Sequence, residues 1–277
     1  MSDEISTTAN DASANAPVKR RAKSRWNISS WNWRGFVSIA CFFLAWQGAV
    51  SLELPGFTKI PGPSEVVHTF VNDYLFTQSY WNSWLVSFER VFWGFALAQI
   101  IGIPFGLFLG TSKLFNNLVF PVFEMMRPIP PLAWVPLSIL FWPTTESSII
   151  FITFIGAFFI ITINIYDGVR SIKQEHIWLA RSLGASRIRI FRRIMIPAVL
   201  PAIAVGMTLG IAVTWNVVIA AEMIASDSGL GRLTWEGYVS STPPVVIVGM
   251  ISIGIAGYLS TMIVDIIERR MMPWKYK

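Results

Sequence analysis

The sequence is short of charge. Only 14% of its 277 residues are charged, whereas 53% are hydrophobic. A soluble globular chain usually carries about 25% charged residues, and water could not solvate so much apolar surface. The composition therefore predicts a membrane protein, and the long apolar runs described below make the expected fold all-α.

Cysteine and histidine are scarce as well, and the phosphate-loop motif is absent. The single cysteine, Cys41, excludes an intramolecular disulfide and a cysteine metal cluster. The two histidines, His68 and His176, lie far apart in the sequence, so we predict neither a catalytic nor a metal site. No Gly-x-x-x-x-Gly-Lys-Ser/Thr phosphate loop occurs, so this chain is not expected to hydrolyse ATP.

Six apolar segments are candidates to cross the membrane, which takes roughly 20 residues of helix. They are residues 35–52, 91–110 with a helical extension back to about Trp81, 118–142, 148–165, 199–223 and 245–267. The third is the least regular, because it contains Pro128, Pro130, Pro131 and Pro136. We expect six transmembrane helices in a domain over residues 35–277.

Lysine and arginine are unevenly divided between the connecting segments. Most of the 22 lie in residues 1–34, in the 167–198 segment and in the C-terminal tail, against only Lys59 and Arg232 in the alternate loops. Basic residues concentrate on the cytoplasmic face. The net charge of +6 thus indicates orientation in a membrane rather than nucleic-acid binding. We expect both termini inside and residues 1–34 to form a disordered basic cytoplasmic tail.

The loop over residues 167–197 has apolar residues at helical spacing on both sides of Gly184. Gly184 suits the C-terminal cap of one helix and Ser186 the N-cap of the next. A basic two-helix loop with exposed apolar side chains needs a surface to cover it. This pattern predicts either that the loop lies on anionic lipid or that it is a docking site for a cytoplasmic protein.

This loop resembles the cytoplasmic loop of bacterial ABC importer permeases, which reads Glu-Ala-Ala, three residues, Gly, nine residues and Ile-x-Leu-Pro. Ala180 corresponds to the second alanine and Gly184 to the glycine, and Ile194 and Pro197 delimit the final motif. Trp178 and Leu179 replace Glu-Ala, and Ile196 replaces leucine. The resemblance implies that residues of this loop dock a separate ATPase: Ala180, Gly184, Ala185, Ser186, Ile194 and Pro197.

Further segments resemble the nitrate/sulfonate/taurine/bicarbonate branch of these permeases. They read RPIPPLAW from Arg127, LGAS from Leu183, PAVLP from Pro197 and AAEM from Ala220, and the resemblance runs over about residues 54–274. It implies a type I ABC importer permease in the bacterial inner membrane that passes a small anion by alternating access. It also implies a homodimer, two ATPase subunits that bind ATP and Mg, a periplasmic solute-binding protein and a lipid environment, with no cofactor in this chain.

Polar residues within the spans are costly and mark pathways. The candidates are Arg127, Arg90, Asn216 and Glu222. Each has an alternative. Arg127 pairs with Glu124 or caps carbonyls freed by the prolines, Arg90 snorkels to the outer interface, and the residues on the fifth span form a hydrogen-bonded helix–helix seam.

Two other classes of protein compete with this interpretation. A stand-alone secondary transporter would show repeats between its halves, and a membrane-embedded enzyme would show a cluster of His, Asp or Glu at membrane depth. The sequence shows neither feature.

Overall fold

The computed structural model describes residues 33–57 and 59–274. The tail predicted over residues 1–34 lies almost entirely outside them. Every element described is helical: α1 (Trp33–Ser51), α2 (Pro63–Thr69), η1 (Phe70–Tyr74), α3 (Gln78–Thr111), α4 (Lys113–Met126), η2 (Pro131–Trp134), α5 (Val135–Phe141), α6 (Thr145–Arg170), α7 (Gln174–Ser182), α8 (Arg187–Ile190), η3 (Phe191–Met195), α9 (Ile196–Ala225), α10 (Leu230–Val239) and α11 (Pro243–Met271).

Four helical stretches in the described residues are long and apolar enough to cross a membrane. They are Gln78–Thr111, Thr145–Arg170, Arg187–Ala225 and Pro243–Met271. These contain four of the predicted spans, and the first predicted span coincides with the shorter apolar helix Gly35–Ser51. The chain divides into two units, residues 1–45 and 46–277, and the larger unit contains all the features described below.

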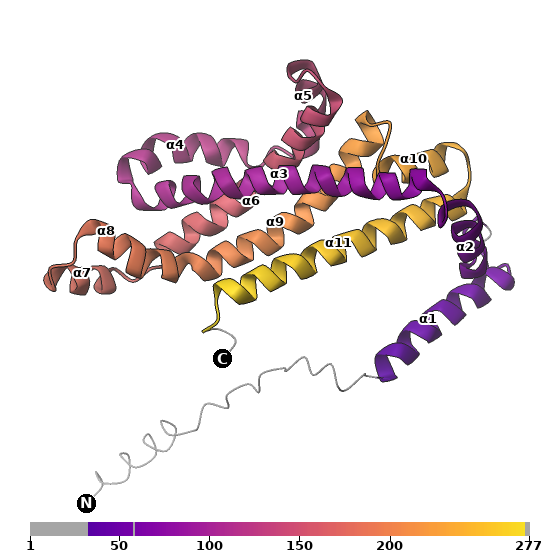
Figure 1. Ribbon diagram of the computed structural model, residues 1–277, viewed down its shortest axis with the longest axis horizontal. Helices are drawn as coiled ribbons and strands as arrows, with labels where there is room; N and C mark the ends of the chain where they lie inside the picture. Colours follow the sequence, from indigo (N-terminus) through magenta and orange to yellow (C-terminus); the bar gives the residue numbers. More distant parts are fainter. Residues whose placement is uncertain (1–32, 58, 275–277) are drawn as a thin grey trace, which may run out of the picture. The chain divides into compact units, whose positions relative to one another are not determined.

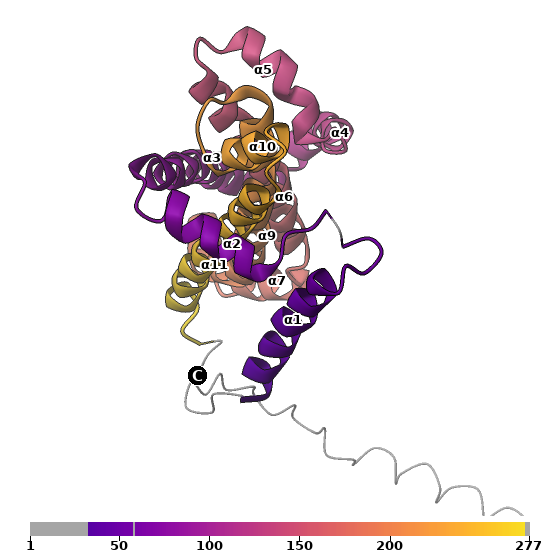
Figure 2. The same cartoon turned by 90° about the vertical axis from the view of Figure 1, so that its right-hand side faces the viewer.

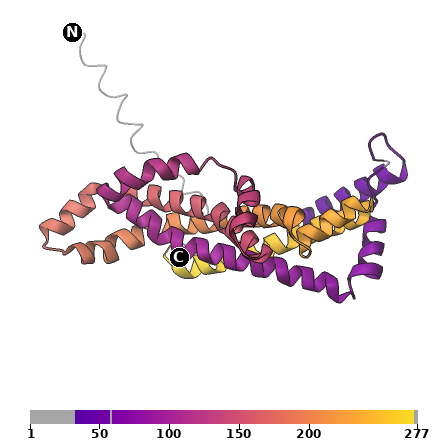
Figure 3. The ribbon, with the colours of Figure 1, turned by 90° about the horizontal axis from the view of Figure 1, so that it is seen from above.

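The third predicted span, residues 118–142, is not one helix, and that expectation was wrong. α4 ends at Met126, and the chain resumes helical structure only at η2 and α5, which is seven residues long. Proline has no N–H to donate and disfavours helix in the residue before it. Pro128, Pro130 and Pro131 therefore end α4, which lies beside the C-terminal part of α3 (Figures 1 and 3).

α6 is the central helix of the larger unit and packs most extensively on α3 and α9. Its inward residues Ile149, Ile152, Ile161 and Ile165 are fully buried. α3 approaches closely because it carries glycines at the contact. A Cβ on Gly94 would stand 2.5 Å from the Thr153 side chain, and one on Gly106 2.8 Å from the Thr162 carbonyl oxygen. Small residues allow such backbone approach in membrane helices.

The layer formed by α3, α6 and α9 has two ends, both within residues 46–277. The α7–α8 loop lies at one end, where α6 finishes and α9 begins, and α10 lies at the other, where α9 finishes and α11 begins (Figures 1 and 2). A candidate functional feature occurs at each end.

Candidate functional site

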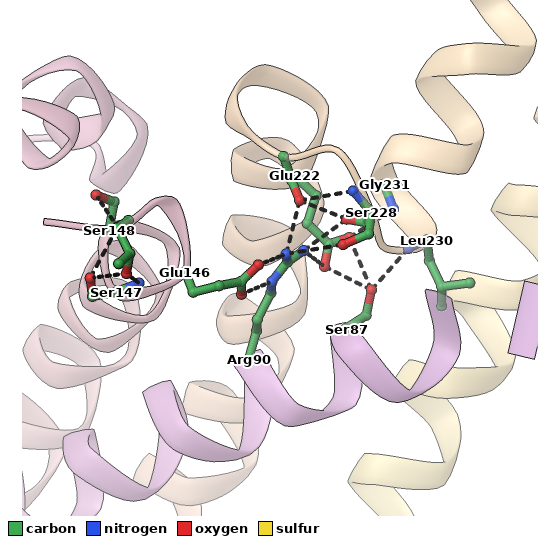
Figure 4. A network of polar contacts seen from close by, with 11 residues as sticks. Ser87, Arg90, Glu146, Ser147, Ser148, Glu222, Ser228, Leu230 and Gly231 are labelled. Carbon is green, nitrogen blue, oxygen red and sulfur yellow. Dashed lines mark hydrogen bonds and ion pairs between the residues drawn. The ribbon is translucent and has the colours of Figure 1, made fainter. Parts of the chain in front are cut away.

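Arg90, on α3, is the centre of a buried polar cluster at the α10 end (Figure 4). Its side chain is only 1% exposed. Nε donates to Glu146 Oε2 at 2.7 Å, and Nη2 donates to Glu146 Oε1. Nη1 donates to Glu222 Oε1 and to the Ser228 carbonyl oxygen, both at 2.9 Å, and Nη2 also donates to Ser226 Oγ at 2.9 Å. All five guanidinium donors are therefore in use.

Glu222, near the end of α9, is fully buried. Ser87 Oγ donates to Oε1 at 2.7 Å, and the Gly231 N–H donates to Oε2 at 2.8 Å. Ser87 Oγ in turn accepts the Leu230 N–H at 2.9 Å. A buried carboxylate is tolerated only when it is paired and hydrogen-bonded, so these contacts join α3, α9 and the start of α10.

Glu146 is the accessible member of the cluster. It lies in the first turn of α6, and its side chain is 56% exposed although both of its oxygens accept hydrogen bonds from Arg90. We did not predict Glu146, Ser87, Ser226 or Ser228 as site residues. Local spacing could not link Glu146 to Arg90, because the two lie 56 positions apart. Ser87 lies three positions before Arg90 and Ser226 four after Glu222, so helical spacing could have identified these two serines.

The structure brings two predicted pathway residues, Arg90 and Glu222, into contact at 2.9 Å. Arg90 does not snorkel to the interface, since its side chain is enclosed by protein. Glu222 does take part in a helix–helix hydrogen-bond seam, with Ser87 of α3. Within this cluster both residues hold helices together.

Arg127, at the C-terminal cap of α4, pairs with Glu124 at 2.8 Å. This is the local ion pair that the three-residue spacing predicts. The two side chains are 39% and 43% exposed. Among the described residues no hydrogen bond or ion pair connects them to the Arg90 cluster, so the two arginines belong to separate sites.

Asn216 is exposed on α9, whereas its neighbours Thr214 and Trp215 are buried. Thr214 Oγ1 donates to the Gly210 carbonyl oxygen of its own helix at 2.8 Å. The seam expected at this depth of α9 therefore does not join Thr214 to another helix. The Asn216 amide remains open to whatever lies against this face of α9.

The α7–α8 turn has the predicted caps. The Ala185 N–H bonds the Ala180 carbonyl at 3.0 Å and the Gly184 N–H bonds the Arg181 carbonyl at 2.9 Å, which is the Schellman pattern. Gly184 has a φ of +75°. Ser186 Oγ accepts the Arg189 N–H at 3.4 Å and caps α8. The prediction of helix, glycine cap, serine cap and helix is confirmed.

This turn presents an apolar and basic surface, which we call the α7–α8 surface. Its large exposed apolar side chains are Trp178, Leu179, Leu183 and Ile188. Its exposed basic residues are Arg181, Arg187, Arg189, Arg192 and Arg193. Ala180, Ala185 and Ile194 are half-buried, and Gly184, Ser186 and Pro197 are exposed. Contiguous apolar surface of this kind marks an interaction site.

Side chains that could bind a metal ion do not form a site in the described part of the chain. Across residues 33–57 and 59–274, no group of three or more His, Cys, Asp or Glu side chains is placed to hold a metal ion.

A multi-pass helical membrane protein with a capped, exposed two-helix loop is the class that this fold and these sites define. The family of binding-protein-dependent transport system inner membrane components matches residues 102–273, and the chain belongs to this family. The permease assignment made from the sequence motifs is confirmed.

Several relatives resemble the chain along most of its length. A putative ABC transporter permease, MJ0413 of Methanocaldococcus jannaschii, is 38% identical over 78% of this chain and 82% of its own length. The taurine transport system permease TauC of Escherichia coli is 29% identical over 92% and 94%. The nitrate import permease NrtB of Synechocystis is 31% identical over 88% and 90%.

The fold resembles a chain of the MetNI methionine ABC transporter, solved in inward-facing conformations. The TM-score is 0.57 at 21% identity, over 70% of this chain and 94% of that one. The predicted type I importer permease fold is confirmed.

Proposed function

We propose that this chain forms the membrane pathway of an ATP-driven importer for a small oxyanion. Two copies of the chain would enclose the pathway, and two separate ATPase subunits that bind ATP and Mg would dock on the α7–α8 surfaces. A periplasmic solute-binding protein would deliver the solute at the α10 end. Both termini would then be cytoplasmic, in a bacterial inner membrane, with residues 1–34 as a cytoplasmic tail.

The α7–α8 surface carries this proposal. Four large apolar side chains project beside five arginines on a turn with satisfied caps. The exposure of Trp178, Leu179 and Leu183 would be unfavourable in water. A lipid surface could accept the same side chains. A transporter driven by ATP, however, needs a stable protein contact that transmits the conformational change of the ATPase to the membrane helices. We therefore favour an ATPase groove as the covering surface.

The second copy would lie against the face of α9 that carries Asn216. An exposed amide such as Asn216 is costly against lipid, where no partner completes its hydrogen bonds. A pathway on the axis of a dimer would give Asn216 water or solute as a partner. We infer that Asn216 and Arg127 face this pathway, since both keep exposed polar atoms near membrane-spanning helices.

The solute class follows from chemistry and from the named relatives. The names of TauC and NrtB refer to taurine and nitrate. The name of a related permease, CmpB of Synechococcus elongatus, refers to bicarbonate. These solutes share an oxyanion group. An arginine fork suits such a group, and Arg127 is an exposed arginine, away from the α7–α8 surface, that would guide it.

The test is reconstitution. The chain is purified in mild detergent with whatever ATPase accompanies it and placed in proteoliposomes with the solute-binding protein. Uptake of labelled nitrate, taurine and bicarbonate is then measured with and without ATP. We expect uptake of one of them only with ATP. Uptake driven by an ion gradient without ATP would instead establish the alternative, a stand-alone secondary transporter.

A further inference from the structure

Arg90 has two carboxylate partners of different character. Glu222 is fully buried and is also held by Ser87 and the Gly231 N–H. Glu146 is 56% exposed, and its side chain bonds only to Arg90 among the described residues. Glu222 is therefore a fixed structural partner, whereas a side-chain rotation would release Glu146 into its exposed surroundings.

The edge of Arg90 that faces Glu146 has the geometry of an oxyanion receptor. Nε and Nη2 donate side by side to the two oxygens of one carboxylate (Figure 4). This two-point arrangement also fits nitrate, bicarbonate and sulfonate oxygens. Since Arg90 is only 1% exposed, nothing else can reach this edge while Glu146 covers it.

The charges of the cluster favour replacement of the Glu146 carboxylate by a free oxyanion. One guanidinium serves two carboxylates, and Glu222 alone already balances Arg90. When Glu146 is released, Arg90 and Glu222 still form a neutral pair. No buried charge is then left without a partner. A free oxyanion that takes the place of Glu146 restores the charge and both hydrogen bonds.

We propose that the Nε–Nη2 edge of Arg90 is an oxyanion-binding site, and that Glu146 occupies it as a built-in competitor. The proposal rests on the proposed import of an oxyanion. Because Glu146 is tethered beside the site, it competes at a high effective concentration. It therefore keeps the affinity for a passing anion low, as permeation requires.

The test compares variants in the purified permease–ATPase complex. Glu146→Ala removes the competitor, and Glu146→Gln removes its charge at nearly constant size. Glu236→Ala is the matched control, because Glu236 is 54% exposed and pairs with Arg232 at 2.9 Å outside the cluster. Nitrate, taurine and bicarbonate serve as probes. Binding is read as a saturable rise in the thermal unfolding midpoint, in detergent without phospholipid and at constant ionic strength.

We expect Glu146→Ala to lower the apparent dissociation constant for at least one probe about tenfold or more relative to the wild type. Glu146→Gln should lower it less, and Glu236→Ala should leave it unchanged. A folded Glu146→Ala complex with wild-type affinity would overturn the proposal. If that variant does not fold, Glu146→Gln decides, and an unchanged affinity there overturns the proposal equally.

A phospholipid headgroup offers the same oxyanion chemistry as a solute. The titration is therefore repeated in nanodiscs of phosphatidylethanolamine with and without phosphatidylglycerol. If lipid abolishes probe binding to Glu146→Ala, Arg90 binds headgroups and the solute site is overturned; retained binding supports it. ATP-driven uptake by the wild type with no gain of binding in the Glu146 variants would reject this site alone, whereas absence of any ATP-driven uptake would reject the proposed function.

Discussion

Gly229 lies against Glu222 so closely that a Cβ on it would stand 2.5 Å from the carboxylate carbon. Its backbone, at φ +113° and ψ 169°, also occupies a region that is essentially confined to glycine. Gly229 thus allows the chain between α9 and α10 to close over the buried carboxylate, which the Gly231 N–H then reaches at 2.8 Å.

Replacing Gly229 should destabilise this closure. We expect Gly229→Ala to cost about 1–3 kcal/mol from backbone strain alone, with a further loss from the contact with Glu222. The thermal unfolding midpoint of the detergent-solubilised protein measures the effect. Gly254→Ala is the matched control, because a Cβ there meets nothing within 4 Å. Equal midpoints for the two variants would contradict the close approach.

Removing the charge of Arg90 alone should destabilise the protein more than removing the charges of Arg90 and Glu222 together. Arg90→Gln leaves Glu222 buried without its counter-ion, which costs about 3–5 kcal/mol. The double variant Arg90→Gln, Glu222→Gln should recover part of that loss. Unfolding in mixed micelles measures both, and Arg232→Gln, in an exposed ion pair, should cost only about 0–1 kcal/mol. A double variant no more stable than Arg90→Gln would exclude the coupling.

Gly184→Asp should leave the chain in the membrane but uncouple the ATPase. An aspartate at φ +75° strains the Schellman cap and places negative charge among the arginines of the α7–α8 surface. We expect co-purification of the ATPase and ATP-driven uptake to fall. Gly56→Asp is the control, since Gly56 also has a positive φ, of +95°, and open space around it. Wild-type transport by Gly184→Asp would disprove docking at this turn.

Arg127→Gln should lower uptake while assembly and ATP hydrolysis persist. One charge-assisted hydrogen bond is worth about 1.5–3 kcal/mol, so uptake at low solute concentration should fall about tenfold or more. Glu124→Gln frees Arg127 from its partner at 2.8 Å and should not lower uptake. Unchanged uptake in Arg127→Gln would contradict a role in guiding the solute, and a complex that does not assemble would make Arg127 a structural residue.

The distribution of lysine and arginine predicts the orientation of the chain. A reporter fused after Lys277 should be cytoplasmic, and one inserted near Asp73, in η1, should be external. Alkaline phosphatase and green fluorescent protein fusions report the two sides. The opposite labelling would place the α7–α8 surface outside, where no ATPase could reach it.

Local features of the sequence predicted local structure well. Gly184 and Ser186 act within one turn of the backbone they cap, so their roles follow from nearest neighbours. Glu124 and Arg127 lie three positions apart, and a helix brings them together at 2.8 Å. The prolines after Arg127 marked the irregular third segment, but their spacing did not show that α4 would end at Met126.

The partners of Arg90 could not be predicted in this way. Its apolar surroundings in the sequence gave it the appearance of an interfacial arginine, yet it is buried between carboxylates from α6 and α9. These carboxylates are 56 and 132 positions away, so their approach depends on how three helices pack.

By itself, then, the sequence determined the apolar helices other than the proline-broken third segment, the caps of the α7–α8 turn and the family. Each of these depends on composition or on spacing along one segment. Only the tertiary structure decided that Arg90 pairs with one buried carboxylate, Glu222, and one exposed carboxylate, Glu146. The physical reason is that a guanidinium enclosed by protein needs acceptors for all five donors. The packing of α3, α6 and α9 supplies those acceptors from distant parts of the chain.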